Sequence, residues 1–152
     1  MTVDVGDPAP DFQLRDQNNQ EVALASYRTR KAVLLVFYPL AFTGTCQGEL
    51  TAVQQQLADF ENEKVQILTV SVDSPYAHKV WSDRESYTFP LLSDFWPHGE
   101  VARSYGVLNE SKGYANRGTF LIDQDGTIAF TEHHPSSRPR DLSVWRAAIA
   151  AL

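Results

Sequence analysis

Cys46 is the residue of this chain best suited to chemistry, because it is the one cysteine among 152 residues. A thiolate can act as a nucleophile or as a redox centre. A single thiol cannot form a disulfide within its own chain, so a disulfide at Cys46 requires a thiol from another molecule. Pro39 and Thr43 precede it in the pattern Pro39-x-x-x-Thr43-x-x-Cys46, directly after the apolar run 32–37.

Ionisation by itself gives a thiol only limited reactivity. A free thiol is already a few per cent thiolate at pH 7, so full ionisation increases its reaction rate by at most about thirtyfold. Part of that gain is lost because nucleophilicity falls with basicity. A fast thiol enzyme must therefore aim donors at the substrate oxygens, and we expect Thr43 and an arginine to supply them.

The segments around Cys46 predict a strand followed by a helix. The run 32–37 is apolar throughout, which predicts a strand inside a sheet that is covered by helices on both faces. Apolar residues then recur at helical spacing and predict an amphipathic helix over 46–61; they are Leu50, Val53, Leu57 and Phe60. Cys46 would lie in the first turn, where free N–H groups and the helix dipole favour an anion.

Two hairpins and two further helices complete the predicted elements. Segments 11–15 and 21–24 flank turn residues 17–20, and segments 120–122 and 127–130 flank the turn 123–126. A strand is expected over 65–72, and Ser74 with Pro75 provides an N-cap and a first-turn proline for a helix carrying Val80 and Trp81. Asp141 should start a terminal helix, with these residues inward: Leu142, Trp145, Ile149 and Leu152.

Composition restricts the class of protein. A chain of 152 residues that is 43% hydrophobic and 21% charged is typical of one compact domain, here 1–152. The net charge of −6, without a basic run, argues against nucleic acid or an anionic membrane as a partner. We find no membrane-span pattern and no export signal, and with a single cysteine we expect a cytoplasmic protein.

The pattern around Cys46 resembles the signature of the peroxiredoxins, thiol peroxidases built on the thioredoxin fold. Three further motifs extend the resemblance over most of the chain: GDPAPDF at 6–12, FPLLSD at 89–94 and RGTFLID at 117–123. It implies a thioredoxin-like α/β fold, with a central mixed sheet flanked by helices and an N-terminal β-hairpin. It also implies that Cys46 attacks a peroxide and becomes a sulfenic acid, while Thr43 and Arg117 bind the peroxide oxygens.

The resemblance gives two more residues a role. Pro39, which lacks an N–H, would shield the thiolate, and Glu49 would orient Arg117 and help bind substrate. Each site residue also has a plainer interpretation. Thr43 could cap the helix, Pro39 could end the strand, and Arg117 could form a surface ion pair. Glu49 could be a first-turn charge favoured by the helix dipole, and Cys46 could be a small buried apolar residue.

The lone cysteine implies a peroxiredoxin of the one-cysteine type, and the stretches 37–50, 91–98 and 115–120 most resemble the alkyl hydroperoxide reductases of actinobacteria. The chain ends at Leu152, directly after the predicted terminal helix, so we do not expect the extended, large one-cysteine type. The resemblance implies hydrogen peroxide, organic hydroperoxides or peroxynitrite as substrates. It implies an external thiol as reductant, either mycothiol with a mycoredoxin or a thioredoxin-like protein. It further implies a homodimer and no cofactor.

Two other functions stay open from the sequence. A peroxide sensor or redox relay would pass the oxidation of Cys46 to a partner protein, and an interaction protein would carry an inert, buried thiol. The four histidines show no ligand spacing, and the adjacent His133 and His134 would point to opposite faces of a strand, so we expect no metal site. Trp81, Phe95 and Trp96 are expected in the core or in an interface.

Overall fold

The computed structural model describes residues 3–134 and 139–152, which form nine strands and four α-helices. The strands are β1 (Gln13–Arg15), β2 (Glu21–Ala23), β3 (Ala32–Phe37), β4 (Val65–Ser71), β5 (Leu91–Ser93), β6 (Leu108–Asn109), β7 (Tyr114–Ala115), β8 (Arg117–Ile122) and β9 (Ile128–His134). The helices are α1 (Gly44–Gln55), α2 (Pro75–Glu85), α3 (Glu100–Ser104) and α4 (Leu142–Ala150). Two 3-10 turns cover Leu24–Tyr27 and Leu57–Asp59.

One mixed sheet organises the molecule, with the strand order β2-β1-β5-β4-β3-β8-β9. Strands β3, β4 and β5 are parallel, whereas β1, β2, β8 and β9 pair antiparallel with their neighbours. Since parallel strands end at the same edge of a sheet, the segments leaving β3, β4 and β5 start close together. The predicted mixed sheet and N-terminal hairpin are confirmed.

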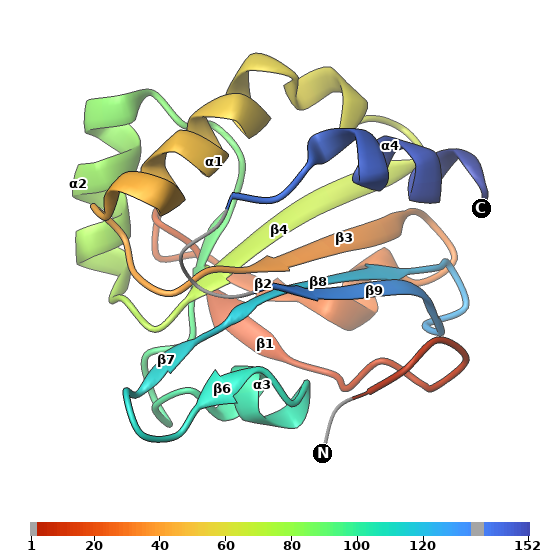
Figure 1. Cartoon of the computed structure of the whole chain (residues 1–152), viewed down its shortest axis with the longest axis horizontal. Helices are drawn as coiled ribbons and strands as arrows, with labels where there is room; N and C mark the ends of the chain where they lie inside the picture. Colours follow the sequence, from red (N-terminus) through yellow and green to blue (C-terminus); the bar gives the residue numbers. More distant parts are fainter. Residues whose placement is uncertain (1–2, 135–138) are drawn as a thin grey trace.

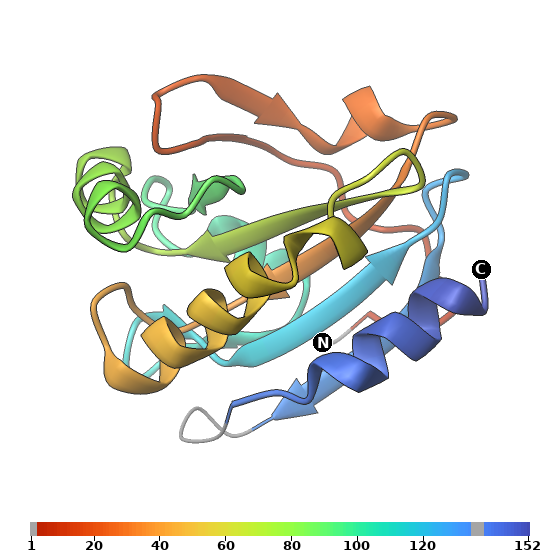
Figure 2. The ribbon, with the colours of Figure 1, turned by 90° about the horizontal axis from the view of Figure 1, so that it is seen from above.

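Helices cover both faces of this sheet (Figures 1 and 2). On one face, α1, α2 and α4 bury a core that includes Leu50, Trp81 and Trp145 against β3 and β4. On the other face, α3 and the N-terminal segment pack around Tyr105 and Phe37. All six residues of β3 are buried, as its unbroken apolar run predicts.

Local sequence signals fixed several element ends. Ser74 caps α2, its hydroxyl accepting from the N–H of Ala77 at 3.1 Å, and Pro75 opens the helix. Asp141 caps α4 by accepting from the N–H of Ser143 at 2.9 Å. The turn of the first hairpin places Asn19 at φ 59°, in the left-handed region that asparagine tolerates.

Other expectations need correction. The helix predicted over 46–61 runs from Gly44 to Gln55 and continues as the 3-10 turn Leu57–Asp59, because a spacing of three residues suits that tighter turn too. Leu152 lies beyond the end of α4 and is 55% exposed, so it does not join the core.

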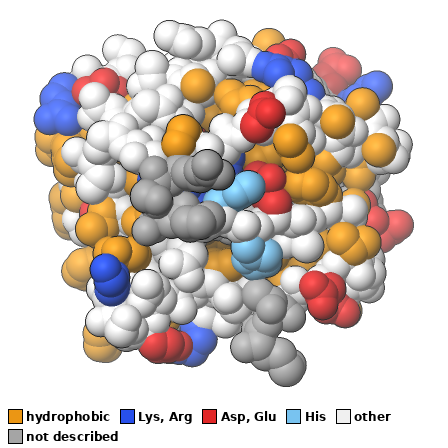
Figure 3. All heavy atoms as spheres, viewed as in Figure 1, with side chains coloured by type: hydrophobic (Ala, Val, Ile, Leu, Met, Phe, Trp, Pro, Cys, Tyr) orange, Lys and Arg blue, Asp and Glu red, His pale blue; other side chains and the backbone are white. Residues whose placement is uncertain are grey.

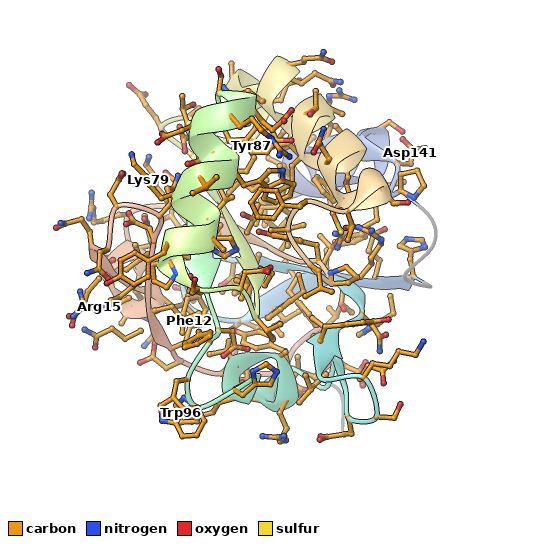
Figure 4. All side chains as sticks on the ribbon, turned by 90° about the vertical axis from the view of Figure 1, so that its left-hand side faces the viewer. Phe12, Arg15, Lys79, Tyr87, Trp96 and Asp141 are labelled. Carbon is orange, nitrogen blue, oxygen red and sulfur yellow. The ribbon has the colours of Figure 1, made fainter. Side chains whose placement is uncertain are left out.

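The two neighbouring aromatic residues Phe95 and Trp96 are not core residues. Phe95 is 53% exposed and Trp96 is 81% exposed, and Trp96 projects from the edge of the molecule below α2 (Figure 4). Trp81, by contrast, is fully buried. The apolar character of these three side chains could not separate them, because one compact domain leaves many apolar atoms at its surface.

The surface combines charged and apolar side chains. On the face seen in Figure 3, acidic and basic side chains are interspersed with hydrophobic ones. None of the helices within residues 3–134 and 139–152 is long and apolar enough to cross a membrane.

Candidate active site

Cys46 lies near the start of α1, the helix that follows the central strand β3. Strand β3 ends at Phe37, the segment 38–43 follows, and Thr43 is the extended residue before the helix begins at Gly44. The first intrahelical N–H is that of Gln47, which donates to the carbonyl of Thr43 at 2.8 Å. Cys46 therefore lies in the first turn, where the helix dipole stabilises negative charge. Its side chain is fully buried.

An arginine from a distant strand contacts the sulfur. Arg117 is the first residue of β8, and its Nη2 donates to Cys46 Sγ at 3.0 Å, while its Nη1 donates to Glu49 Oε1 at 2.8 Å. Only 1% of Arg117 is exposed. Because a guanidinium keeps its charge and holds its donors in a rigid plane, it supplies fixed positive potential beside the thiol.

Glu49 joins Arg117 to a second buried arginine, Arg140. Glu49 Oε2 accepts from the Arg140 backbone N–H at 2.8 Å and from Nε at 2.9 Å, and Oε1 accepts from Nη2 at 2.6 Å. Burial raises the pKa of Glu49, but hydrogen bonds and charge from Arg140, followed by the charge of Arg117, outweigh it and lower that pKa. The carboxylate is therefore ionised at neutral pH and fixes both guanidinium groups.

Arg140 extends this network to the strand that carries Arg117. Its Nη1 donates to the carbonyl of Gly118 at 2.9 Å and to Thr119 Oγ1 at 3.0 Å. The segment before α4 is thereby attached both to α1, through Glu49, and to β8. These contacts form a rigid support behind the face of Arg117 that meets Cys46.

Thr43 and Pro39 stand at the mouth of the site. Thr43 occupies the N-cap position but makes no side-chain capping bond; its hydroxyl donates instead to the carbonyl of Leu40 at 2.7 Å. A hydroxyl that has donated its one proton can still accept hydrogen bonds through its oxygen. Pro39, the second residue after the end of β3, is buried.

The predicted residues share one pocket of about 230 Å³. Its lining includes Pro39, Thr43, Cys46 and Arg117, together with Tyr114 from β7. Liquid water occupies about 30 Å³ per molecule, so the pocket can admit a peroxide with a small substituent. Larger hollows of about 470 and 780 Å³ lie elsewhere, and no thiol lines them. The four residues are thus brought together, whereas Glu49 lies behind Arg117 and does not line the pocket.

Sequence reasoning missed Arg140 and Tyr114. Arg140 is 91 residues away from Glu49 in the chain, so no local pattern reveals their contact. A signal was nevertheless present: Glu49 shares the inward face of α1 with Cys46, Leu50 and Val53. A buried carboxylate requires charged or hydrogen-bonding partners, so the inward position of Glu49 indicated such partners without identifying Arg140. Tyr114 carried no such signal, since it lies in a two-residue strand.

Comparison with known proteins links this geometry to one family. Residues 5–131 match the model of the AhpC/TSA family. The chain is similar to alkyl hydroperoxide reductase E of Mycobacterium tuberculosis, with 54% identity over 150 residues, 99% of this chain and 98% of the relative.

Solved structures give the same result. A reduced 2-Cys peroxiredoxin of Plasmodium vivax is 30% identical with a TM-score of 0.87, covering 97% of this chain and 80% of that one. AhpC of Enterococcus faecalis is 27% identical with a TM-score of 0.88, covering 99% of this chain and 92% of that one.

Proposed function

This chain belongs to the AhpC/TSA family of peroxiredoxins, which are thiol peroxidases, and we propose that it reduces peroxides at Cys46 by a one-cysteine mechanism. The observation that carries the proposal is the contact of 3.0 Å between Arg117 Nη2 and Cys46 Sγ inside the pocket of about 230 Å³. The substrates are hydrogen peroxide, organic hydroperoxides or peroxynitrite.

In the oxidation step, the Cys46 thiolate attacks the terminal oxygen of a peroxide ROOH. A sulfur–oxygen bond forms and the oxygen–oxygen bond breaks, so sulfur loses two electrons to the peroxide. The hydroxyl oxygen stays on sulfur as a sulfenic acid, and RO⁻ leaves and takes up a proton to become ROH. Negative charge therefore moves from sulfur to the leaving oxygen, which must be stabilised as it develops.

Arg117 has a position suited to that charge, whereas Thr43, expected from the sequence to supply a donor, has its hydroxyl proton bonded to Leu40 and can instead orient the peroxide. Arg117 lies against Sγ on one side of the pocket, so its donors can follow the charge as it passes to the peroxide oxygens. The Thr43 oxygen can accept from the peroxide O–H, because its own proton is given to Leu40. Pro39 excludes water without adding a competing N–H. Glu49, through its contact of 2.8 Å, positions Arg117.

Reduction is the half of the cycle that this chain cannot complete alone. A thiol R′SH attacks the sulfenic acid, releasing water and leaving a mixed disulfide at Cys46, and a second thiol then restores the Cys46 thiol while forming R′SSR′. We assign the thiol to mycothiol with a mycoredoxin or to a thioredoxin-like protein, in view of the 54% identity to a mycobacterial relative. We also propose a cytoplasmic homodimer.

Turnover tests this function against the relay alternative. Reduced protein mixed with hydrogen peroxide in a stopped-flow instrument should give a fast fluorescence change from its three tryptophans. The isosteric variant Cys46→Ser should give none. With a supplied thiol the wild type should consume many equivalents of peroxide, whereas a relay would stop after one unless its partner were added.

Mass spectrometry identifies the reductant. After one equivalent of peroxide, Cys46 should carry one added oxygen, and adding mycothiol should convert that adduct into a mixed disulfide. Absence of peroxide-dependent oxidation of Cys46 in folded wild-type protein would refute the proposed function.

A further inference from the structure

A buried polar cluster lies beneath the segment that carries Pro39 and Thr43. It contains Tyr38, Ser71, Asp73, His78 and Ser93. Tyr38 follows the end of β3, Ser71 and Ser93 are the last residues of β4 and β5, and His78 comes from α2. Because β3, β4 and β5 are parallel, their ends meet at this edge, and α2 closes it (Figure 4).

His78 is the centre of the cluster. Its side chain is fully buried, and this burial lowers the pKa of His78 to about 4. The imidazole is therefore neutral at pH 7. A neutral imidazole has one N–H and one acceptor nitrogen. Its Nε2 lies 2.7 Å from Ser71 Oγ and its Nδ1 lies 3.0 Å from Ser93 Oγ.

The number of protons in this cluster limits which groups can donate hydrogen bonds and which must accept them. The Ser71 hydroxyl donates its single proton to Asp73 Oδ2 at 2.5 Å. In the tautomer that carries the imidazole proton on Nε2, the Ser71 oxygen accepts from His78 and Nδ1 accepts from Ser93. Hydrogen bonds thus run from His78 to Ser71 and on to the carboxylate of Asp73.

The cluster holds the active-site segment at two points. Asp73 Oδ2 also accepts from the backbone N–H of Ala41 at 2.8 Å. The Tyr38 hydroxyl oxygen lies 3.1 Å from the same His78 Nε2, where it can share the N–H with Ser71, and Tyr38 directly precedes Pro39. The two points of attachment lie on either side of Pro39, which lines the pocket beside Cys46.

The conformation of this segment requires such support. Phe42, between Ala41 and Thr43, adopts φ 68°, a left-handed conformation that a bulky side chain disfavours. Strained residues of this kind persist only where the surrounding structure holds them. Phe42 itself is 42% exposed, so much of its own side chain lies outside the packed core. The hydrogen bond to Ala41 restrains the backbone at the preceding residue.

We infer that, provided Cys46 is the peroxide-reacting residue proposed above, His78 is a positioning residue that acts through Ser71 and Asp73 to hold Pro39 and Thr43 in reactive alignment with the Cys46 sulfur. Among the described residues, the side chains that hydrogen-bond His78 are Tyr38, Ser71 and Ser93, and neither His78 nor these partners line the pocket. Its effect reaches the pocket through the backbone of the segment 38–43. Misalignment of reacting groups by about 1 Å costs on the order of a hundredfold in rate.

Two pairs of variants test this inference. Ser71→Ala removes the hydroxyl that joins His78 to Asp73, and Thr69→Val is its matched control. Thr69 is a buried residue of the same strand, and its hydroxyl donates to the carbonyl of Pro90 at 2.9 Å rather than to the segment 38–43. In the second pair, the amide of His78→Gln can reach the Nε2 position, whereas that of His78→Asn is too short.

The measurement is the second-order rate constant for oxidation of the reduced protein by hydrogen peroxide, at a temperature at which every variant is folded. We expect Ser71→Ala and His78→Asn to lower it by about tenfold to a hundredfold. Thr69→Val should stay within about twofold of the wild type, and His78→Gln should recover part of the rate lost in His78→Asn.

The results separate this inference from the proposed function. A wild type that shows no oxidation at Cys46 would refute the proposed function itself. A reactive wild type with an unchanged rate in Ser71→Ala, or with equal losses in Ser71→Ala and Thr69→Val, would overturn the positioning role. If Ser71→Ala does not fold, the histidine pair decides, since equal rates for His78→Asn and His78→Gln would overturn it as well.

Discussion

Replacing Arg117 by alanine separates two ways in which an arginine can help a thiol peroxidase. The guanidinium lies 3.0 Å from Cys46 Sγ, so it can favour the thiolate before the reaction and can stabilise the peroxide oxygens during it. The first effect changes how much thiolate is present, and the second changes the energy of the transition state. We expect the second effect to dominate.

The two effects differ in size. Loss of ionisation can lower the rate by at most about thirtyfold, since a free thiol is still a few per cent thiolate at pH 7. Loss of one well-placed donor to a developing oxyanion costs about a hundredfold to a thousandfold. Arg117→Ala should therefore reduce the oxidation rate constant by more than about a hundredfold at pH 7.

The fold should tolerate this substitution. In this variant Glu49 still accepts hydrogen bonds from the backbone N–H, Nε and Nη2 of Arg140, so the buried negative charge of its carboxylate keeps a cationic partner. Arg117→Lys is the matched control because it retains the charge but not the planar donors. We expect its rate to lie between those of the wild type and Arg117→Ala.

The assay is stopped-flow oxidation by hydrogen peroxide between pH 6 and pH 9.5. If Arg117 acts in the transition state, the deficit of Arg117→Ala persists at high pH, because a larger thiolate fraction does not replace a missing donor to the peroxide oxygens. Recovery of the wild-type rate at pH 9.5 would refute the reasoning, because it would mean that the loss merely followed the thiolate fraction.

Three further predictions concern stability. Glu49→Gln leaves two buried arginines without their carboxylate, so denaturant unfolding should show a loss of about 3–5 kcal/mol; a loss below 1 kcal/mol would contradict the buried triad. The folded-state pKa of His78, about 4, lies below the ordinary 6.5, so the folded protein is most stable above pH 6.5, where the imidazole is neutral in both states. Up to about 3 kcal/mol of stability is lost as the pH falls from 6.5 to 4. Unfolding curves should show a smaller loss of stability in acid for His78→Gln than for the wild type, and equal losses would disprove this prediction. Ser74→Ala should cost about 1 kcal/mol through the lost cap of α2, with Ser111→Ala, exposed between β6 and β7, as a surface control; equal effects of the two would reject the cap.

Local physical signals explain which elements could be predicted. The apolar run of β3, the Ser74–Pro75 start of α2 and the Asp141 cap of α4 act within a few residues, so each appears directly in the sequence. The end of α1 could not be placed, because the spacing of Leu57 and Phe60 is compatible with an α-helix and with the observed 3-10 turn. Exposure of Trp96 depends on which side of the molecule the loop faces, and no local pattern records that.

The sequence by itself determined the chemical constraint on this protein: one thiol, in a strand-to-helix signature, that cannot form a disulfide within the chain. It also supplied Pro39 and Thr43, because both lie within seven residues of Cys46.

The tertiary structure decided what surrounds that thiol. Arg117 reaches Cys46 across 71 residues, and Arg140 reaches Glu49 across 91. Parallel pairing of β3, β4 and β5 brings Tyr38, Ser71 and Ser93 to His78 at one edge of the sheet. Periodicity reports which face of an element is buried, but strand order and register decide which distant polar groups meet there.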